Sequence, residues 1–362
     1  MTDTTKTKKQ FFIFLLVAFG VTYAMGILTW YGSTVGAEMS VFPTAQMFYP
    51  AAGVMLAYLL TEWKERLLPR WFFVCFLLVT VLMLTLAVCG IVLPEQESMV
   101  LGQPVSTWAI FSQNVLIGGS VLGWVTLLAA GKNRRAAYGL GFHKWKASLA
   151  CVFVFLLLYF TRAWVSYAMS GEPGMMLEVF KNQTTWMYLL MLPVNFLLAF
   201  APFLGEEYGW RYYMQPLLQK WFGMRAGVLV LGVAWGVWHV FLDFFYYTTP
   251  DMGLIMTISQ VITCITLGIF FAWAYLKTGN LWVPVILHYL NNNLSLVVAN
   301  NYSVDVLENQ QLTWAMIPQA LLLNGILFGL FILSREFRKK TPDDAVDEKP
   351  FQRSDMLGAN IR

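Results

Sequence analysis

The chain has 362 residues and a formal net charge of +4, and it is strongly apolar. Hydrophobic residues make up 58% of it and charged residues only 12%, whereas about a quarter of a soluble globular chain is charged. So little polar surface excludes a protein that stays dissolved as one or two globular domains, and it indicates that lipid is the solvent.

Ten apolar stretches are long enough to cross a membrane, since a helix needs about 20 apolar residues to do so. They predict an all-α, polytopic membrane bundle of about ten transmembrane helices. The first stretch is too long for a signal peptide, so we expect it to be a retained anchor. The stretches are 11–32, 44–62, 71–93, 105–130, 148–170, 186–210, 224–247, 253–276, 280–300 and 312–334.

The distribution of basic residues predicts the orientation. If the N-terminus is cytoplasmic, the segments on the cytoplasmic side carry 22 of the 24 Lys and Arg residues. Retention of Lys and Arg in the cytoplasm is the main determinant of orientation, so both termini are predicted to be cytoplasmic. The basic residues are thereby explained by topology, and no nucleic-acid partner is expected. The protein would be multi-pass, in the cell membrane if it is bacterial, with the lipid bilayer as its surroundings.

Ionisable residues inside the predicted spans are few, and such residues usually face a bundle interior or a functional site. Five of the seven fall between positions 206 and 243, which favours one polar centre in the C-terminal half. The seven are Arg162, Glu206, Glu207, Arg211, His239, Asp243 and His288.

The pair of adjacent glutamates is the first motif. On a helix, Glu207 and Arg211 are i,i+4 neighbours and can form a salt bridge. Glu206 is rotated by about 100° from Glu207, so its carboxylate points elsewhere. We predict that Glu207 is structural and that Glu206 is available for chemistry. A helix end that carries only a salt bridge is the simpler alternative.

The second motif is a histidine beside a glycine face. Gly232 and Gly236 form a small-xxx-small pattern that lets another helix approach closely, and His239 follows them. Asp243 lies four residues further on, in position to orient the second ring nitrogen of His239. A packing hydrogen bond is the open alternative for this histidine.

The third motif combines an imidazole and a carboxamide. His288 and Asn292 lie i,i+4 on one helical face, after a helix start marked by Asn280 and Pro284. This pair suits oxyanion stabilisation or polar coordination. A purely structural network between helices is the alternative.

Together, the three motifs resemble those of the CPBP family, which includes the type II CAAX prenyl endopeptidases and bacterial relatives linked to bacteriocin processing or self-immunity. The family pattern is EExxxR, then FxxxH, then HxxxN, on successive membrane helices. Here it reads Glu206-Glu207-xxx-Arg211, Trp235-xxx-His239 and His288-xxx-Asn292. Trp235 replaces the usual phenylalanine, an aromatic exchange that leaves the chemistry intact. The resemblance covers roughly residues 190–300.

The resemblance implies an intramembrane endopeptidase in which Glu206 activates the attacking water and His239 assists. His288 and Asn292 would stabilise the oxyanion. The supporting residues would be Glu207, Arg211, Trp235 and Asp243. Its substrate would be a membrane protein, a lipidated CAAX-type protein or a bacteriocin-related peptide.

The catalytic type stays open, because family members have been described both as metalloproteases and as glutamate proteases. Glu206, His239 and His288 could hold zinc, or the same groups could polarise water without a metal.

On this reading, residues 1–185 form five N-terminal spans and residues 186–300 the CPBP-like catalytic core. Residues 301–334 form the last transmembrane helix, and residues 335–362 a charged cytoplasmic tail that we expect to be disordered. Two other functions stay open. One is a non-proteolytic membrane immunity or scaffold protein of the same fold, and the other is a proton-coupled transporter.

Overall fold

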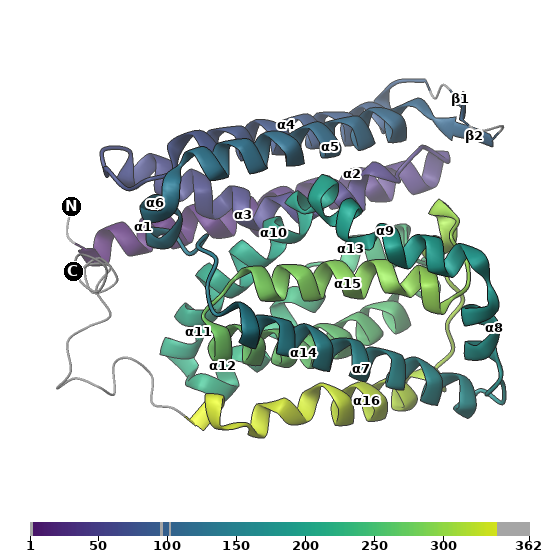
Figure 1. Ribbon diagram of the computed structural model, residues 1–362. Helices are drawn as coiled ribbons and strands as arrows, with labels where there is room; N and C mark the ends of the chain where they lie inside the picture. Colours follow the sequence, from purple (N-terminus) through teal and green to yellow (C-terminus); the bar gives the residue numbers. More distant parts are fainter. Residues whose placement is uncertain (1–2, 95–96, 101–102, 339–362) are drawn as a thin grey trace. The chain divides into compact units, whose positions relative to one another are not determined.

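The computed structural model describes residues 3–94, 97–100 and 103–338, and nearly all of them are helical (Figure 1). The predicted class, a helical multi-pass membrane protein, is confirmed. The chain divides into two compact units. Among the described residues, the first holds those up to Gly141 together with Leu197–Tyr213, and the second holds Phe142–Phe196 and 214–338. Most of the predicted tail, from residue 339, lies outside the described residues.

The first unit is built from a long N-terminal helix and an antiparallel helical pair. The N-terminal helix passes through a π-helical turn, η1, and then continues as α2. Figure 1 shows α4 beside α5, and the hairpin of β1 and β2 joins them. The elements are α1 (Asp3–Leu15), η1 (Leu16–Val21), α2 (Thr22–Val35), α3 (Val41–Glu62), α4 (Arg70–Val92), β1 (Glu97–Val100), β2 (Gln103–Ser106), α5 (Thr107–Ala129), α6 (Gly131–Ala137), α10 (Ala201–Glu207) and η2 (Tyr208–Met214).

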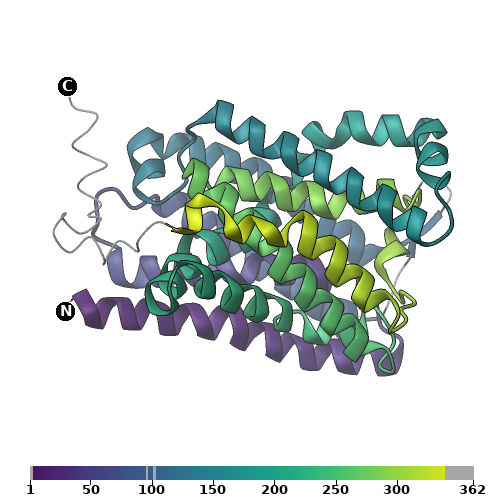
Figure 2. The same ribbon diagram turned by 90° about the horizontal axis from the view of Figure 1, so that it is seen from below.

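The second unit is organised around α14, which contacts α7, α12, α13, α15 and α16. Figure 2 shows α16 running along α14. The elements are α7 (Trp145–Met169), α8 (Met175–Lys181), α9 (Gln183–Ala199), α11 (Gln215–Phe222), α12 (Met224–Val237), α13 (Val240–Phe245), α14 (Gly253–Thr278), α15 (Trp282–Val298), η3 (Val304–Leu307), α16 (Met316–Leu327), η4 (Gly329–Leu333) and η5 (Arg335–Arg338).

The predicted count of ten spans is not confirmed. Within the described residues, six helices are long and apolar enough to cross a membrane, and α9 with the helix Ala201–Phe222 makes a seventh if this bent pair is one span. The predicted spans 44–62, 280–300 and 312–334 do form helices, namely α3, α15 and α16. However, α15 has only 17 residues. Helix α16 has 12, because a 3-10 turn that begins at Gly329 follows it. Helix α3 is long enough but less apolar than the six.

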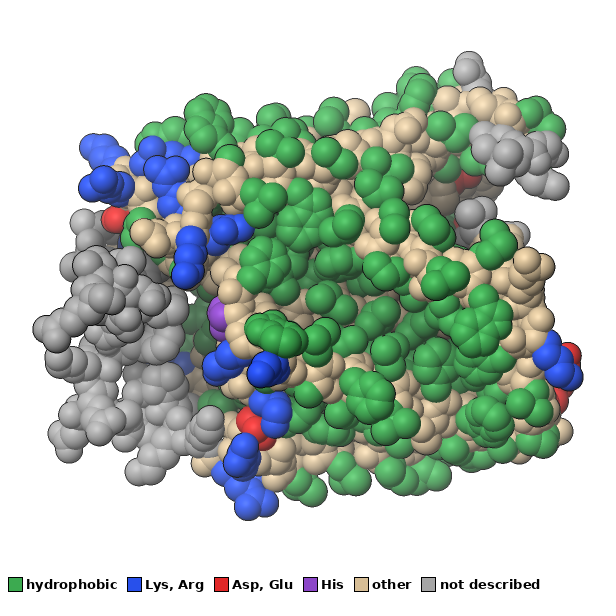
Figure 3. All heavy atoms as spheres, viewed as in Figure 1, with side chains coloured by type: hydrophobic (Ala, Val, Ile, Leu, Met, Phe, Trp, Pro, Cys, Tyr) green, Lys and Arg blue, Asp and Glu red, His purple; other side chains and the backbone are tan. Residues whose placement is uncertain are grey.

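Side chains along the helices are largely hydrophobic at the surface, as expected for contact with lipid (Figure 3). In the second unit, Lys and Arg side chains gather where α7 begins (Figure 3). This end holds Lys144 and Lys146 of the predicted cytoplasmic segment 131–147. The clustering agrees with the predicted orientation.

A buried carboxylate ties the end of α3 to two other parts of the first unit. Glu62 accepts hydrogen bonds from Gln10 Nε2 (3.1 Å) and Tyr138 Oη (2.6 Å), and Lys6 Nζ lies 3.0 Å from it. Its side chain is only 4% exposed. The sequence did not single out Glu62, because it stands at the edge of a predicted span.

Replacing Glu62 should therefore loosen the first unit. We expect Glu62→Gln to lower the free energy of unfolding by about 1–3 kcal/mol, since hydrogen bonds to a charged group are lost inside the protein. Glu65→Gln, at an exposed position of the following loop, is the matched control and should be near neutral. Thermal unfolding of both variants in detergent measures the difference, and equal melting temperatures would contradict the role given to Glu62.

Candidate active site

The glutamate motif lies where an α-helix changes into a π-helix. Pro202 stands at the start of α10, where its missing N–H costs no helical hydrogen bond. Helix α10 ends at Glu207, and the π-helix η2 carries Arg211. Short π-helical turns are often found at functional sites. The motif thus lies on the arm beyond the bend at Phe200, and not at the end of one straight span as the sequence suggested.

Two glycines that flank the glutamates hold this arm flush against α3. A Cβ added at Gly205 would collide with the backbone carbonyl of Met47, and one at Gly209 would lie 3.0 Å from Cα of Pro50. No side chain fits between these backbones, so the position of α10 on α3 is fixed. The Gly205-xxx-Gly209 spacing is the sequence pattern that signals such a close helix contact.

The two carboxylates have different partners, as predicted. Arg211 Nε donates to Glu207 Oε2 over 2.9 Å, and both side chains are completely buried. Glu206 Oε2 instead accepts a hydrogen bond from Trp210 Nε1 at 3.2 Å. The prediction of a Glu207–Arg211 pair is confirmed.

Trp210 is the residue beside the glutamates to which the sequence alone gave no role. Its indole is fully buried, and its ring meets those of Phe14 and Phe19 at centroid distances of 6.0 and 5.8 Å. The ring is thereby locked, and its N–H fixes the direction of the Glu206 carboxylate. The i,i+4 spacing of Glu206 and Trp210 was the available signal.

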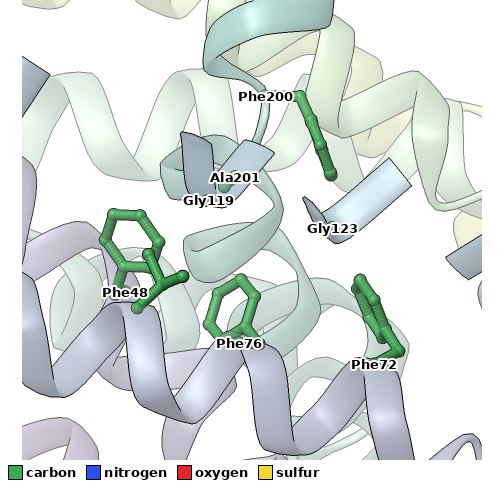
Figure 4. Close-up of a pocket in the computed structure, with 8 residues that line it drawn as sticks. Phe48, Phe72, Phe76, Gly119, Gly123, Phe200 and Ala201 are labelled. Carbon is green, nitrogen blue, oxygen red and sulfur yellow. The ribbon is translucent and has the colours of Figure 1, made fainter. Parts of the chain in front are cut away.

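An apolar recess adjoins the start of α10 in the first unit (Figure 4). Phenylalanines of α3 and α4 and two glycines of α5 surround Phe200 and Ala201. All lining residues are apolar, so the recess offers no group for activating water. They are Phe48, Phe72, Phe76, Val79, Gly119, Gly123, Phe200 and Ala201.

The second motif lies in the second unit, at the break between α12 and α13. A Cβ added at Gly232 would lie 2.6 Å from Cα of Ile265, and one at Gly236 would lie 2.6 Å from Cα of Val261. The predicted close approach is therefore confirmed, and the partner helix is α14. His239 follows at the N-cap of α13, where the chain leaves α12.

A backbone carbonyl, and not Asp243, orients the His239 ring. His239 Nδ1 lies 2.9 Å from the carbonyl oxygen of Trp235. A carbonyl can only accept, so Nδ1 carries the proton and the neutral ring keeps its lone pair on Nε2. Asp243 is completely buried in α13, and its backbone N–H donates to the His239 carbonyl oxygen over 2.9 Å, but within the described residues its carboxylate accepts no hydrogen bond from the His239 ring. The orienting role predicted for Asp243 is not observed: the Trp235 carbonyl, which the helix break leaves available, accepts from the ring instead.

Trp235 lies against two histidines of the second unit, His239 and His288. Its ring is 5.5 Å from that of His288 in an edge-on arrangement and 6.4 Å from that of His239. Phe271 of α14 adds a further ring at 6.0 Å from His288. The aromatic residue of the FxxxH pattern thus brings two imidazoles from different helices together.

The three consecutive asparagines of α15 do different things. The backbone oxygen of Asn291 accepts from Tyr159 of α7 (3.3 Å), and Oδ1 of Asn293 accepts from Tyr188 of α9 (3.1 Å). These bonds hold α15 to its neighbours. Asn292 Oδ1 accepts from the adjacent Asn291 amide at 3.1 Å, a bond within α15.

Each unit therefore prepares one half of the predicted centre. The first holds Glu206 beside the Glu207–Arg211 pair, and the second holds His239, His288 and Asn292. That the two halves meet stays a prediction. Among the residues that the structure describes, no group of three or more His, Cys, Asp or Glu is placed to hold a metal ion.

The helices and motifs define a multi-pass membrane protein with polar residues built into its spans. The family model of type II CAAX prenyl endopeptidase Rce1-like proteins matches residues 185–294, which contain all three motifs. The match confirms the resemblance predicted from the three motifs for this segment of the chain.

A curated relative, CAAX prenyl protease 2 of Methanococcus maripaludis, is 26% identical over 122 residues. The match covers 32% of this chain and 45% of that relative, so the chain matches less than half of the relative's length. No solved structure matched the chain.

The glycine contact under the glutamates can be tested directly. We expect Gly205→Ala to lower both stability and activity, since the added methyl collides with backbone of α3, which cannot move aside. Gly118→Ala is the matched control, because an added Cβ there meets nothing within 4 Å and helix propensity favours alanine by about 1 kcal/mol. The measurement is thermal unfolding of both variants, and equal melting temperatures for Gly205→Ala and Gly118→Ala would contradict the contact.

Proposed function

We propose that this chain is an intramembrane endopeptidase of the CAAX type, which hydrolyses a peptide bond of a membrane-associated protein or peptide. The observation that carries the proposal is the division of labour between the two glutamates. Arg211 pairs with Glu207, while Glu206 accepts a hydrogen bond from the Trp210 indole, which orients its carboxylate. Both lie in the segment that matches the family model.

In the proposed reaction, the Glu206 carboxylate takes a proton from water as the water oxygen attacks the scissile carbonyl carbon. His239, with its lone pair on Nε2, assists in holding that water. The carbonyl oxygen becomes an oxyanion, which His288 and the Asn292 amide stabilise by hydrogen bonds. When the C–N bond breaks, Glu206 returns the proton to the leaving amine. One water is thereby consumed, and a carboxylate and an amine are formed.

Zinc is the second way in which these groups could work. Two imidazoles and a carboxylate are ligands that zinc accepts, and Glu206, His239 and His288 would hold it. Bound zinc would polarise the scissile carbonyl. Because no three-residue metal group occurs among the described residues, we derive no step through it. Metal analysis of purified protein, with and without a chelator and alongside cleavage, would test this.

Glu206→Gln should abolish cleavage, because the amide keeps the shape of the side chain but cannot take a proton. The expected loss is about 10²–10⁴-fold or more. The readout is cleavage of a quenched fluorescent peptide with a farnesylated CAAX end by purified protein in detergent, beside the same peptide without the lipid. Expression and melting temperature should be unchanged.

Glu207→Gln supplies the comparison. It breaks a fully buried ion pair, so it should lower the melting temperature strongly. Normal cleavage by Glu206→Gln would sink the assignment. A wild-type protein that folds and cleaves neither peptide would instead favour a non-proteolytic immunity or scaffold protein.

The asparagines give a second matched pair. Asn292→Ala should lower kcat by about 10²–10³-fold while the melting temperature stays the same, as for loss of an oxyanion donor. Asn293→Ala should lower the melting temperature, since its side chain bonds Tyr188 and the Tyr289 carbonyl oxygen. If Asn292→Ala lowered the melting temperature and Asn293→Ala lowered kcat instead, the oxyanion role proposed for Asn292 would be refuted.

A further inference from the structure

Arg162 is a charged residue inside a membrane span that the proposed site does not use. It lies in α7, one of the six helices long and apolar enough to cross a membrane, and outside the segment that matches the family model. A guanidinium is always charged, and a charge within a span requires partners. The contacts of Arg162 therefore indicate what it binds.

Aromatic rings hold the guanidinium of Arg162 against the seam between α7 and α16. Its Cζ atom lies 4.6 Å from the ring centroid of Tyr159 and 6.0 Å from that of Phe328. Nη1 donates to Oδ1 of Asn324, at 3.4 Å, and Asn324 is only 5% exposed. These contacts fix the plane of the guanidinium.

The polar lining of the seam extends one turn further along both helices. Gln319 Nε2 of α16 donates to Ser166 Oγ of α7 at 3.3 Å. Ser166 lies four residues after Arg162, so these groups share one face of α7. The neighbouring faces of α7 carry Leu157 and Trp164, which are 58% and 44% exposed and would contact lipid.

The part of the chain that the structure describes places no carboxylate against the charge of Arg162. Within the described residues, no carboxylate lies within 4.0 Å of its guanidinium, and its hydrogen-bond acceptor is a neutral amide. The side chain is only half-buried, so donors of the guanidinium remain accessible from the seam. A guanidinium with spare donors in one plane suits a phosphate, which can accept two parallel hydrogen bonds.

The position along α7 places this group near lipid headgroups. Helix α7 has 25 residues and is thus about 37 Å long, against about 30 Å for the hydrocarbon core. Arg162 is seven residues from the C-terminal end of the helix, and its side chain can reach towards the headgroup layer. In the predicted orientation this is the outer leaflet.

We propose that the seam between α7 and α16 binds the headgroup phosphate of an anionic phospholipid through Arg162. Asn324 and the rings of Tyr159 and Phe328 hold the guanidinium, while Ser166 and Gln319 contact the polar part of the headgroup. The acyl chains lie along the apolar faces of α7. This site is independent of the proposed peptidase centre.

The test uses full-length protein in detergent with added phosphatidylglycerol, phosphatidylcholine or soluble glycerol phosphate. We expect phosphatidylglycerol to raise the melting temperature more than phosphatidylcholine does, and native mass spectrometry to show its retention. Arg162→Gln should remove at least half of that preference. Lys181→Gln is the control, because Lys181 is 70% exposed and already paired with Glu178.

Three results would overturn the site: an unchanged lipid preference in Arg162→Gln, a preference lost equally in Lys181→Gln, or full reproduction of the effect by glycerol phosphate. If Arg162→Gln does not fold, wild-type protein decides the question. A photoactivatable phosphatidylglycerol should then label peptides of α7 and α16, and labelling only elsewhere refutes the proposal.

Discussion

Direct contact between helix backbones at glycine is the constraint on which the rest of this protein depends. In the first unit, Gly205 and Gly209 bring α10 and η2 onto the backbone of α3. In the second, Gly232 and Gly236 bring α12 onto α14 in the same way. Helices surrounded by lipid gain little from the hydrophobic effect, so close packing and polar contacts must hold them together. In the first unit Glu206 immediately follows Gly205, and in the second His239 lies about one turn after Gly236.

This arrangement explains how the chain tolerates polar groups inside its spans. Glu207 has Arg211, and Glu206 has the indole of a tryptophan that is itself clamped by two phenylalanines. The imidazole of His239 is bound to a carbonyl that the break between α12 and α13 leaves available. Each of these bonds satisfies a polar group and also fixes its direction, as the proposed hydrolytic centre would require before substrate arrives.

The family match and the geometry carry different parts of the argument. The match to residues 185–294 supports the family resemblance for that segment, and the match to the M. maripaludis relative covers less than half of that protein's length. The contacts supply what a family assignment does not, namely which glutamate is engaged by arginine and which asparagines are engaged by tyrosines. Arg162 lies outside the matched segment, so the proposed binding of a phospholipid there does not rest on the family match.

The sequence by itself determined the membrane class, the Glu207–Arg211 pair and the close helix contact at Gly232 and Gly236, because composition and i,i+4 spacing act locally. It could not determine the number of spans, since the bend at Phe200 and the short α15 and α16 are set by packing and not by hydropathy. Only tertiary structure decided that a carbonyl and not Asp243 holds His239. The same is true of the locking of Trp210, because the rings that clamp it stand almost 200 residues away in the chain.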